Sequence, residues 1–129
     1  MLNHFMVGTN DIDNAKEFYT KVLGVLGDVK VMENEEKGTK RVFFMGGGPL
    51  FAVTQPANGQ AASAANGGTI GFKCDSPEQV KAFHDTAIAA GGTSIEDPPG
   101  RRDTTMGPLH LCYFRDPDGN KICGIHSGG

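Results

Sequence analysis

The sequence lacks a basic patch, a long apolar run and a paired set of cysteines, and each absence excludes a class of protein. Its 12 basic residues are scattered and outnumbered by 15 acidic residues, so no stripe of charge is present to neutralise the phosphates of a nucleic acid. No apolar run approaches the roughly 20 residues that span a bilayer, and the first residues show no signal peptide. We therefore expect a cytoplasmic protein that binds neither nucleic acid nor membrane.

The cysteines argue against a scaffold of disulfides or zinc. There are three of them, Cys74, Cys112 and Cys123, which is an odd number, and no two form a CxxC pair. The chain has 129 residues, 38% of them apolar, and a formal charge of −3. These values are typical of one compact domain that is long enough to bury a core of its own.

The clearest local signal is the turn sequence Asp116-Pro117-Asp118-Gly119 near the end of the chain. Proline presets φ at the first corner, aspartate tolerates the second, and glycine accepts the geometry that closes the turn. Strand-like runs lie on both sides, at 110–114 and 121–125, and the second contains Cys123. The segment is therefore predicted to be a hairpin.

The first part of the chain predicts a strand, a helix and three further strands. Residues 4–8 form a short strand-like run, and Asp11 can cap a helix near residues 12–24, where apolar residues recur at helical spacing. Strands are expected at 29–33 and 40–45 around a charged turn, and at 50–54 after Gly46-Gly47-Gly48-Pro49. That glycine run is not interpreted as a phosphate loop, because no helix follows it.

The same order of predicted elements, a strand followed by a helix, is repeated after residues 56–68. This stretch is uncharged and rich in alanine and glycine, which is typical of a linker. A strand at 69–74 precedes a helix near 77–90, with Ser76 as its cap and Gln79 placed to close a capping box. A shift of 65 residues aligns Phe18 with Phe83. This weak repeat predicts an α+β domain made of two β-α-β-β-β units, 1–55 and 69–129, with eight strands.

The repeat and the DPDG hairpin together resemble the vicinal-oxygen-chelate superfamily, which contains the glyoxalases, the bleomycin-resistance proteins and the extradiol dioxygenases. The resemblance covers essentially the whole chain. It implies that the sheets curl into a cup around a small-molecule pocket, with the helices outside. It also implies a homodimer in which each pocket is shared between two subunits.

Strand alternation then indicates which side chains face the cup. If His4 points inward, so does Met6, while Phe5 and Val7 point to the helix. Arg101 and Arg102, in the stretch that precedes the last hairpin, are expected to reach over the pocket to an anionic ligand. The candidate ligand-binding residues are His4, Met6, Thr69, Lys73, Arg101, Arg102, Leu111 and Tyr113, and the candidate catalytic residues are His4, Tyr113 and Cys123.

The family's metalloenzymes hold an ion with histidine or glutamine on the first strand, histidine at the start of the second half, and glutamate on closing strands. In this sequence those positions carry His4, Thr69, Cys123 and a residue at or near Ala52. One histidine cannot hold a divalent ion, although His4 and Cys123 together could bind a softer ion weakly. We therefore assign no metal ligand and no cofactor.

Several of these residues also have a plain structural interpretation. Cys123 has no predictable cationic neighbour that would lower its pKa, so an inert thiol is the alternative to a nucleophile. The ring of Tyr113 could simply be packed, and Arg101 and Arg102 could be solvated loop charges. His84 is expected to be an exposed helix residue and His126 a tail residue.

Two functional classes remain open after this comparison of ligand positions. The first is a protein that binds or transforms a small metabolite in the cup without the complete metal site. The second is a divalent-metal-dependent lyase, isomerase or thiol transferase of the glyoxalase kind, in which the ion acts as Lewis acid. The single matching ligand, His4, favours the first class.

Overall fold

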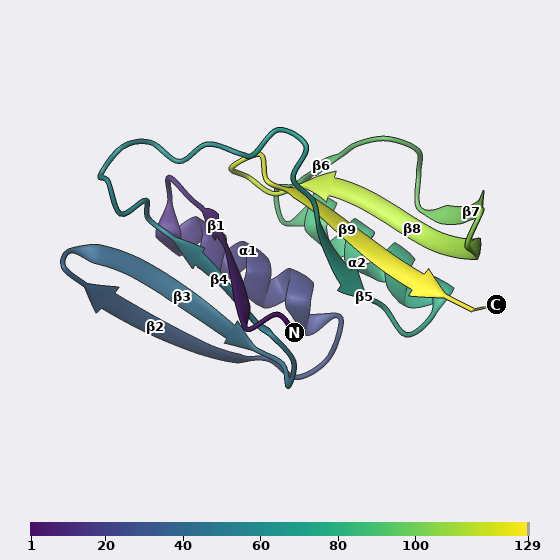
Figure 1. Cartoon of the computed structure of the whole chain (residues 1–129), viewed down its shortest axis with the longest axis horizontal. Coiled ribbons are helices and arrows are strands. Elements are labelled where there is room, and N and C mark those ends of the chain that lie inside the picture. The colour runs from purple at the N-terminus through teal and green to yellow at the C-terminus, as the bar shows by residue number, and fades with distance from the viewer. Residues whose placement is uncertain (129) are drawn as a thin grey trace.

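The computed structural model describes residues 1–128 and has two layers, with two sheets side by side in front of two helices (Figure 1). The first sheet has the strand order β1-β4-β3-β2, and β1 is parallel to β4 while the other pairs are antiparallel. The elements of this half are β1 (His4–Gly8), α1 (Ile12–Gly24), β2 (Lys30–Glu36), β3 (Thr39–Met45) and β4 (Leu50–Thr54).

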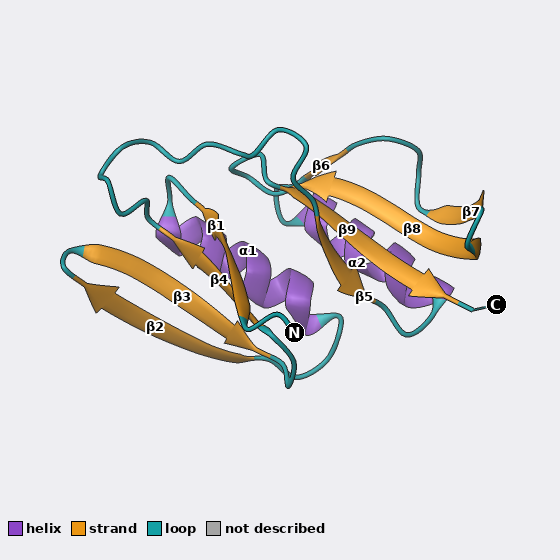
Figure 2. Cartoon of the chain, in the orientation of Figure 1, coloured by secondary structure: helices purple, strands orange, loops and turns teal. Residues whose placement is uncertain are grey.

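The second half repeats the arrangement around a sheet of order β5-β9-β8-β6, with β7 also paired to β8 (Figure 2). Its elements are β5 (Ile70–Lys73), α2 (Pro77–Ala89), β6 (Thr93–Ser94), β7 (Gly100–Thr104), β8 (Gly107–Arg115) and β9 (Lys121–Ser127). α2 begins and ends 65 residues after α1, as the shift between the halves predicts. The α+β fold class and the two β-α-β-β-β units are confirmed.

Between residues 1 and 128 the structure has nine strand segments instead of the predicted eight, because the strand that precedes β8 is broken into β6 and β7. Both pieces pair with β8, at its end and its beginning respectively. Arg101 and Arg102 therefore lie in β7 and not in a loop. The prediction failed here because β8 begins at Gly107, earlier than the apolar run suggests, and gives 100–104 a partner.

Two smaller boundaries also differ from the predictions. β2 continues to Glu36, and the turn to β3 contains only Lys37 and Gly38, which have φ of 52° and 79°. Such left-handed pairs fit a two-residue hairpin turn. In the second half, β5 begins at Ile70, so Thr69 lies just before the strand.

Both helices are capped by the predicted residues. An Oδ1 atom of Asp11 accepts a hydrogen bond from the backbone N–H of Asn14 at 3.1 Å, and the Ser76 hydroxyl accepts one from that of Gln79 at 3.1 Å. The Gln79 side chain does not close a capping box on Ser76. It accepts from the N–H of Asp75 at 2.6 Å and donates to the carbonyl of Val25 at 3.1 Å, which ties the start of α2 to the end of α1.

The core lies between the helices and the sheets. Phe114 of β8 contacts rings from both helices, with ring centroids 6.2 Å from Phe18 and 5.3 Å from Phe83. Phe5 of β1 and Phe72 of β5 meet across the junction of the sheets at 6.1 Å. The two halves thus share one apolar core. None of the helices described between residues 1 and 128 is long and apolar enough to cross a membrane.

The predicted DPDG turn is also the centre of a buried polar network. The N–H of Gly119 donates to the carbonyl of Asp116 at 2.9 Å, which closes the turn. The buried Asp116 carboxylate accepts from the Tyr19 hydroxyl at 2.5 Å, from the Asn120 side-chain amide at 2.9 Å and from the backbone N–H of both Asp118 and Asn120 at 2.9 Å. Burial, together with this carboxylate, raises the pKa of Tyr19 well above its ordinary value.

Replacing Tyr19 with phenylalanine tests this network. The change keeps the ring in the core but removes one donor from a buried carboxylate, and hydrogen bonds to charged groups contribute about 1.5–3 kcal/mol. We expect Tyr19→Phe to lower the free energy of unfolding by that amount in urea titrations. Tyr113→Phe, a change of the same chemistry on the outer sheet face, should cost less, and equal losses would contradict the assignment.

A second stability prediction concerns Gly124, which lies on β9 against α2. A Cβ atom there would be 2.8 Å from the Cys112 sulfur and 2.8 Å from the Phe83 ring, closer than atoms in a packed core tolerate. Gly124→Ala should therefore cost about 1–3 kcal/mol through overpacking. Gly71→Ala is the control, because a Cβ at Gly71 has no neighbour within 4 Å among the described residues, and a large loss there would contradict the assignment of sheet faces.

Candidate functional site

The candidate site lies on the sheet faces that are turned away from the helices, which we call the cup face and which face the viewer in Figure 1. In β1, Phe5 packs on the core while His4 and Met6 are exposed. In the second half, Ile70 and Phe72 pack inward, so Gly71 and Lys73 lie on the cup face. The predicted alternation is observed in both halves.

Tyr113 and Cys123 lie directly opposite each other on β8 and β9, on the cup face. The Cys123 thiol donates to the carbonyl of Gly124 at 3.5 Å, and the Lys121 ammonium stands 4.8 Å from the centre of the Tyr113 ring. Lys121 also forms an ion pair with Glu96. Leu111 lies next to Tyr113 on the same face of β8 and is 9% exposed. The centre of the second sheet therefore presents a half-buried phenol beside a buried thiol and a buried leucine.

The Cys123 thiol is protonated at neutral pH, which bears on its predicted catalytic role. Burial raises its pKa, and the neighbouring Tyr113 hydroxyl and the charge of Lys121 offset that effect only in part. Burial likewise raises the pKa of Cys74 to about 11 and that of Cys112 to about 12. The thiolate is the nucleophilic form of cysteine, so the arrangement suits Cys123 to hydrogen bonding rather than to attack on a ligand.

His4 lies on the cup face of the other sheet and is not brought to Cys123 within the chain. The imidazole Nδ1 atom is 2.7 Å from the Asn3 side-chain oxygen, at an exposed position. Thr69 is exposed just before β5, and Lys73 is exposed near its end. The predicted residues therefore fall into two groups, one on each sheet.

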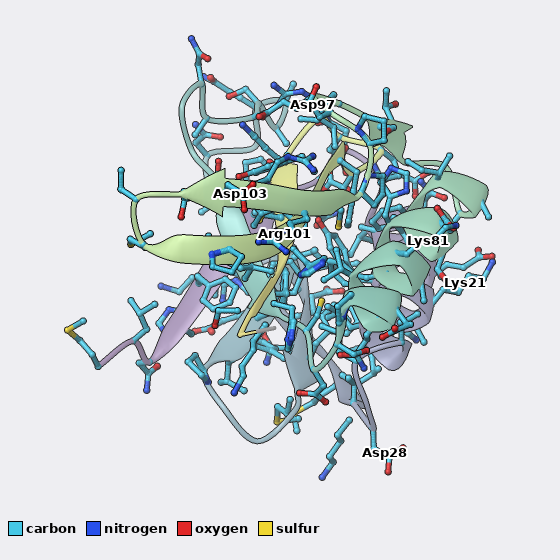
Figure 3. All side chains as sticks on the ribbon, turned by 90° about the vertical axis from the view of Figure 1, so that its right-hand side faces the viewer. Lys21, Asp28, Lys81, Asp97, Arg101 and Asp103 are labelled. Carbon is cyan, nitrogen blue, oxygen red and sulfur yellow. The ribbon has the colours of Figure 1, made fainter. Side chains whose placement is uncertain are left out.

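The two arginines of β7 lie on opposite faces of the sheet. Arg102 pairs with Leu109 of β8 and so shares the cup face with Leu111 and Tyr113. Its guanidinium donates to the backbone carbonyls of Asp97 and Pro98, at 3.1 and 2.8 Å. Arg101 points to the other face, where it forms an ion pair with Asp103 at 3.0 Å. Figure 3 labels Arg101 and Asp103 on this hairpin. Arg101 is therefore poorly placed to reach the cup.

The sequence analysis missed Arg41. Val42 and Phe44 of β3 are buried against α1, so Arg41 and Phe43 lie on the cup face. The Arg41 Nε atom is buried and has no hydrogen-bond partner among residues 1–128. Its nearest acidic partner is Glu36, at 3.8 Å from Nη1. The signal was available, because period-two alternation along 40–45 places Arg41 opposite the apolar positions.

Two histidines differ from their predicted settings. His84 is 8% exposed and not on the helix surface, because its ring bridges Asp85 Oδ1 at 2.9 Å and the Ser94 hydroxyl at 2.8 Å. It thereby fastens α2 to β6. His126 belongs to β9 and its Nδ1 atom contacts the Cys74 carbonyl at 3.1 Å. Both rings have structural partners that no local sequence pattern identifies.

The residues at the family's metal positions do not fit a divalent ion. Ala52 offers no side-chain ligand atom, Thr69 offers only a hydroxyl, and Cys123 is a buried thiol. Over the described part of the chain, no group of three or more His, Cys, Asp or Glu side chains converges. Hard divalent ions take several oxygen or nitrogen ligands together, and His4 alone is the standard ligand here.

A separate cleft of about 620 Å³ lies where the two halves meet. Its walls are apolar and come from the end of α1 and from the inner faces of β1, β4 and β5, with Leu23, Phe5, Phe51 and Phe72 among them. Lys73 is the one predicted ligand-binding residue at its rim. This junction cleft is thus largely distinct from the cup face.

The fold and sequence were compared with known proteins. A "Probable lactoylglutathione lyase" of Vibrio cholerae is 31% identical over 121 residues, which cover 92% of this chain and 85% of that protein. The crystal structure of a glyoxalase/bleomycin resistance protein from Albidiferax ferrireducens has a TM-score of 0.87 and 47% identity, covering 98% of this chain and 99% of that one. A glyoxalase/bleomycin resistance protein/dioxygenase family enzyme from Burkholderia phytofirmans shares the fold with a TM-score of 0.67 at 18% identity, over 95% of each chain.

The family comparison agrees with the two repeated units and with the DPDG hairpin. The sequence matches a protein-family model over residues 1–123. This range includes both α1 and α2 and eight complete strand segments, β1 to β8. Both the fold and this match therefore show that the chain belongs to the Glyoxalase/Bleomycin resistance protein/Dioxygenase superfamily.

Proposed function

We propose that the protein binds a small metabolite on the cup face, in a pocket that two copies of the chain build together, without the standard metal site of the family. The observation that carries this proposal is that each sheet buries only one face. The helices cover the inner faces, and on the outer face of the second sheet the half-buried Tyr113 phenol lies beside the buried Cys123 thiol and the buried Leu111. Largely apolar concave surfaces with a few polar groups are typical of ligand sites.

A second copy of the chain is the natural cover for these faces. Met6 and Met32 are 38% and 46% exposed on the cup face of the first sheet, an apolar surface that pairing would bury. Proteins of this superfamily are typically dimeric with small-molecule ligands. In the proposed homodimer the first sheet of one chain lies opposite the second sheet of the other. That arrangement brings His4 towards Tyr113 and Cys123 of the partner.

Each candidate residue has a role in this proposal. Tyr113 and Cys123 donate or accept hydrogen bonds to the ligand, and Leu111 and Met6 contact its apolar part. His4 is the candidate for proton transfer, because the unperturbed pKa of histidine lies near neutrality. Lys73, Thr69 and Arg102 lie at the margin of the pocket, and Arg101 is given no direct contact because its strand turns it away.

The second candidate function is a divalent-metal-dependent lyase or isomerase of the glyoxalase kind. The observation in its favour is the 31% identity to the Vibrio cholerae protein named as a probable lactoylglutathione lyase. The donor set at His4, Ala52, Thr69 and Cys123 weighs against it. For either function we propose a cytoplasmic location, because all three cysteines are free thiols and reducing compartments keep thiols in that form.

The dimer is tested by placing a charge at the proposed interface. Met6→Glu introduces a carboxylate where apolar surfaces should meet, so light scattering should report a dimer for the wild type at micromolar concentration and a monomer for the variant. Asp13→Lys is the control, because α1 lies on the opposite side of the sheet. A wild-type monomer at that concentration would count heavily against the shared pocket.

The metal content separates the two candidate functions. If the donors are as poor as the geometry indicates, protein purified without chelator should carry well under one equivalent of Mn, Fe, Co, Ni or Zn per subunit. Added metal should scarcely raise the melting temperature, whereas a tightly bound ion contributes about 4 kcal/mol at a thousandfold excess over its dissociation constant. One tightly held ion per site, lost in His4→Ala together with lyase turnover, would favour the metalloenzyme instead.

A further inference from the structure

The cup face carries an excess of positive charge in a protein whose formal net charge is −3. Strand register and alternation place half of the 12 lysines and arginines on this face. They are Lys30, Arg41, Lys73, Arg102, Arg115 and Lys121. Two acids accompany them, Glu36 from β2 and Glu96, which pairs with Lys121. The surface that we propose as the binding face is thus opposite in sign to the protein as a whole.

Several of these cations already have partners within the chain. Lys121 is paired with Glu96, Arg102 donates to two backbone carbonyls, and Arg115 donates to the Gly119 carbonyl at 2.9 Å. Arg41 differs from them. Its Nε–H is buried without an acceptor among the described residues, and the 3.8 Å contact with Glu36 is too long for a hydrogen bond.

An unpaired donor inside a folded protein is costly, and although Nε itself is out of reach of solvent, the Arg41 side chain as a whole is 27% exposed, which leaves its terminal N–H groups to meet a ligand. Arginine presents its N–H groups as a planar fork that matches the two oxygens of a carboxylate or a phosphate. Arg41 is therefore suited to an anionic group more than to a neutral one.

The residues around Arg41 indicate which other groups such a ligand should have. Thr54 of β4 and Asn34 of β2 lie opposite Arg41 in the sheet and add polar atoms on either side. Two residues further along β3, Phe43 pairs with Ala52, which in turn pairs with Met6 of β1. The register thus sets a polar, cationic end beside an apolar row on the same sheet face.

We propose that Arg41 anchors the anionic group of the ligand, and that the ligand is a small organic acid, a carboxylate or a phosphate ester, whose apolar part lies along Phe43 and Met6, which flank the buried Ala52. This inference rests on the proposed binding function of the cup face and specifies its ligand class. The anion forms charge-assisted hydrogen bonds with the guanidinium, and the remaining cations of the face attract it from solution.

The test compares two fluorescent probes that differ by one charged group. Anilinonaphthalene sulfonate carries an anion on an aromatic body, and phenylnaphthylamine has the same rings without it. We expect Arg41→Gln to weaken binding of the sulfonate by about tenfold or more, with little effect on the neutral probe. Arg41→Lys keeps the charge but not the fork and should give a smaller loss. Arg101→Gln, an arginine on the opposite sheet face, should change neither.

The outcomes separate a failure of this inference from a failure of the proposed function. If the wild type binds both probes and Arg41→Gln binds the sulfonate probe equally well, the pocket is present but Arg41 does not hold the anion, and the inference is refuted. A loss confined to Lys73→Gln assigns the sulfonate to the junction cleft and also refutes it. Equal weakening of both probes shows that Arg41 acts on the shape of the face and overturns the inference. Binding of neither probe by the wild type overturns the proposed function itself.

Discussion

The hydrogen bonds to the Asp116 carboxylate hold the two halves of the chain in position against each other. It lies in the closing turn of the second half, yet the Tyr19 hydroxyl of α1 is one of its donors. Asn120 donates to the same carboxylate and also to the Gly8 carbonyl at the end of β1. The N–H of Asn10 donates to Asp118 in that turn at 2.9 Å. One buried charge, satisfied by its own turn, therefore fixes the first half against the last hairpin.

This attachment holds the halves together from the helix side and leaves the opposite faces of both sheets open. The core between helices and sheets is shared, through Phe114 and through the Phe5–Phe72 contact, whereas neither of the helices between residues 1 and 128 covers the cup face. In the proposed function, the binding residues, such as Tyr113, Cys123 and Arg41, therefore lie on these open faces and not in the core between helices and sheets.

Local sequence was enough to predict the helices, because caps and the apolar period act within a few residues, as Asp11, Ser76 and Phe83 illustrate. It was also enough to place Tyr113 and Cys123 on one face, since alternation needs only a strand and one inward residue. It failed for β7, for His84 and for Arg41. Those settings depend on partners distant in sequence, namely β8, Ser94 and the strands beside β3. The ligand cannot be predicted this way, because the proposed pocket needs a second chain.

The parallel pairing of β1 with β4 and of β5 with β9 has a consequence for how the chain folds. In each half the first strand to be synthesised finds its partner only when the last strand of that half arrives, so early contacts are local to the helix and the middle hairpin. Strand pairs that are far apart in sequence slow folding, because the entropy of closing the loop between them is lost before their contacts can stabilise the chain. The hydrogen bond of the Tyr19 hydroxyl forms later still, because its partner Asp116 lies 97 residues further along the chain. During synthesis, the Tyr19 hydroxyl of the first half therefore lacks its carboxylate partner until the final hairpin emerges.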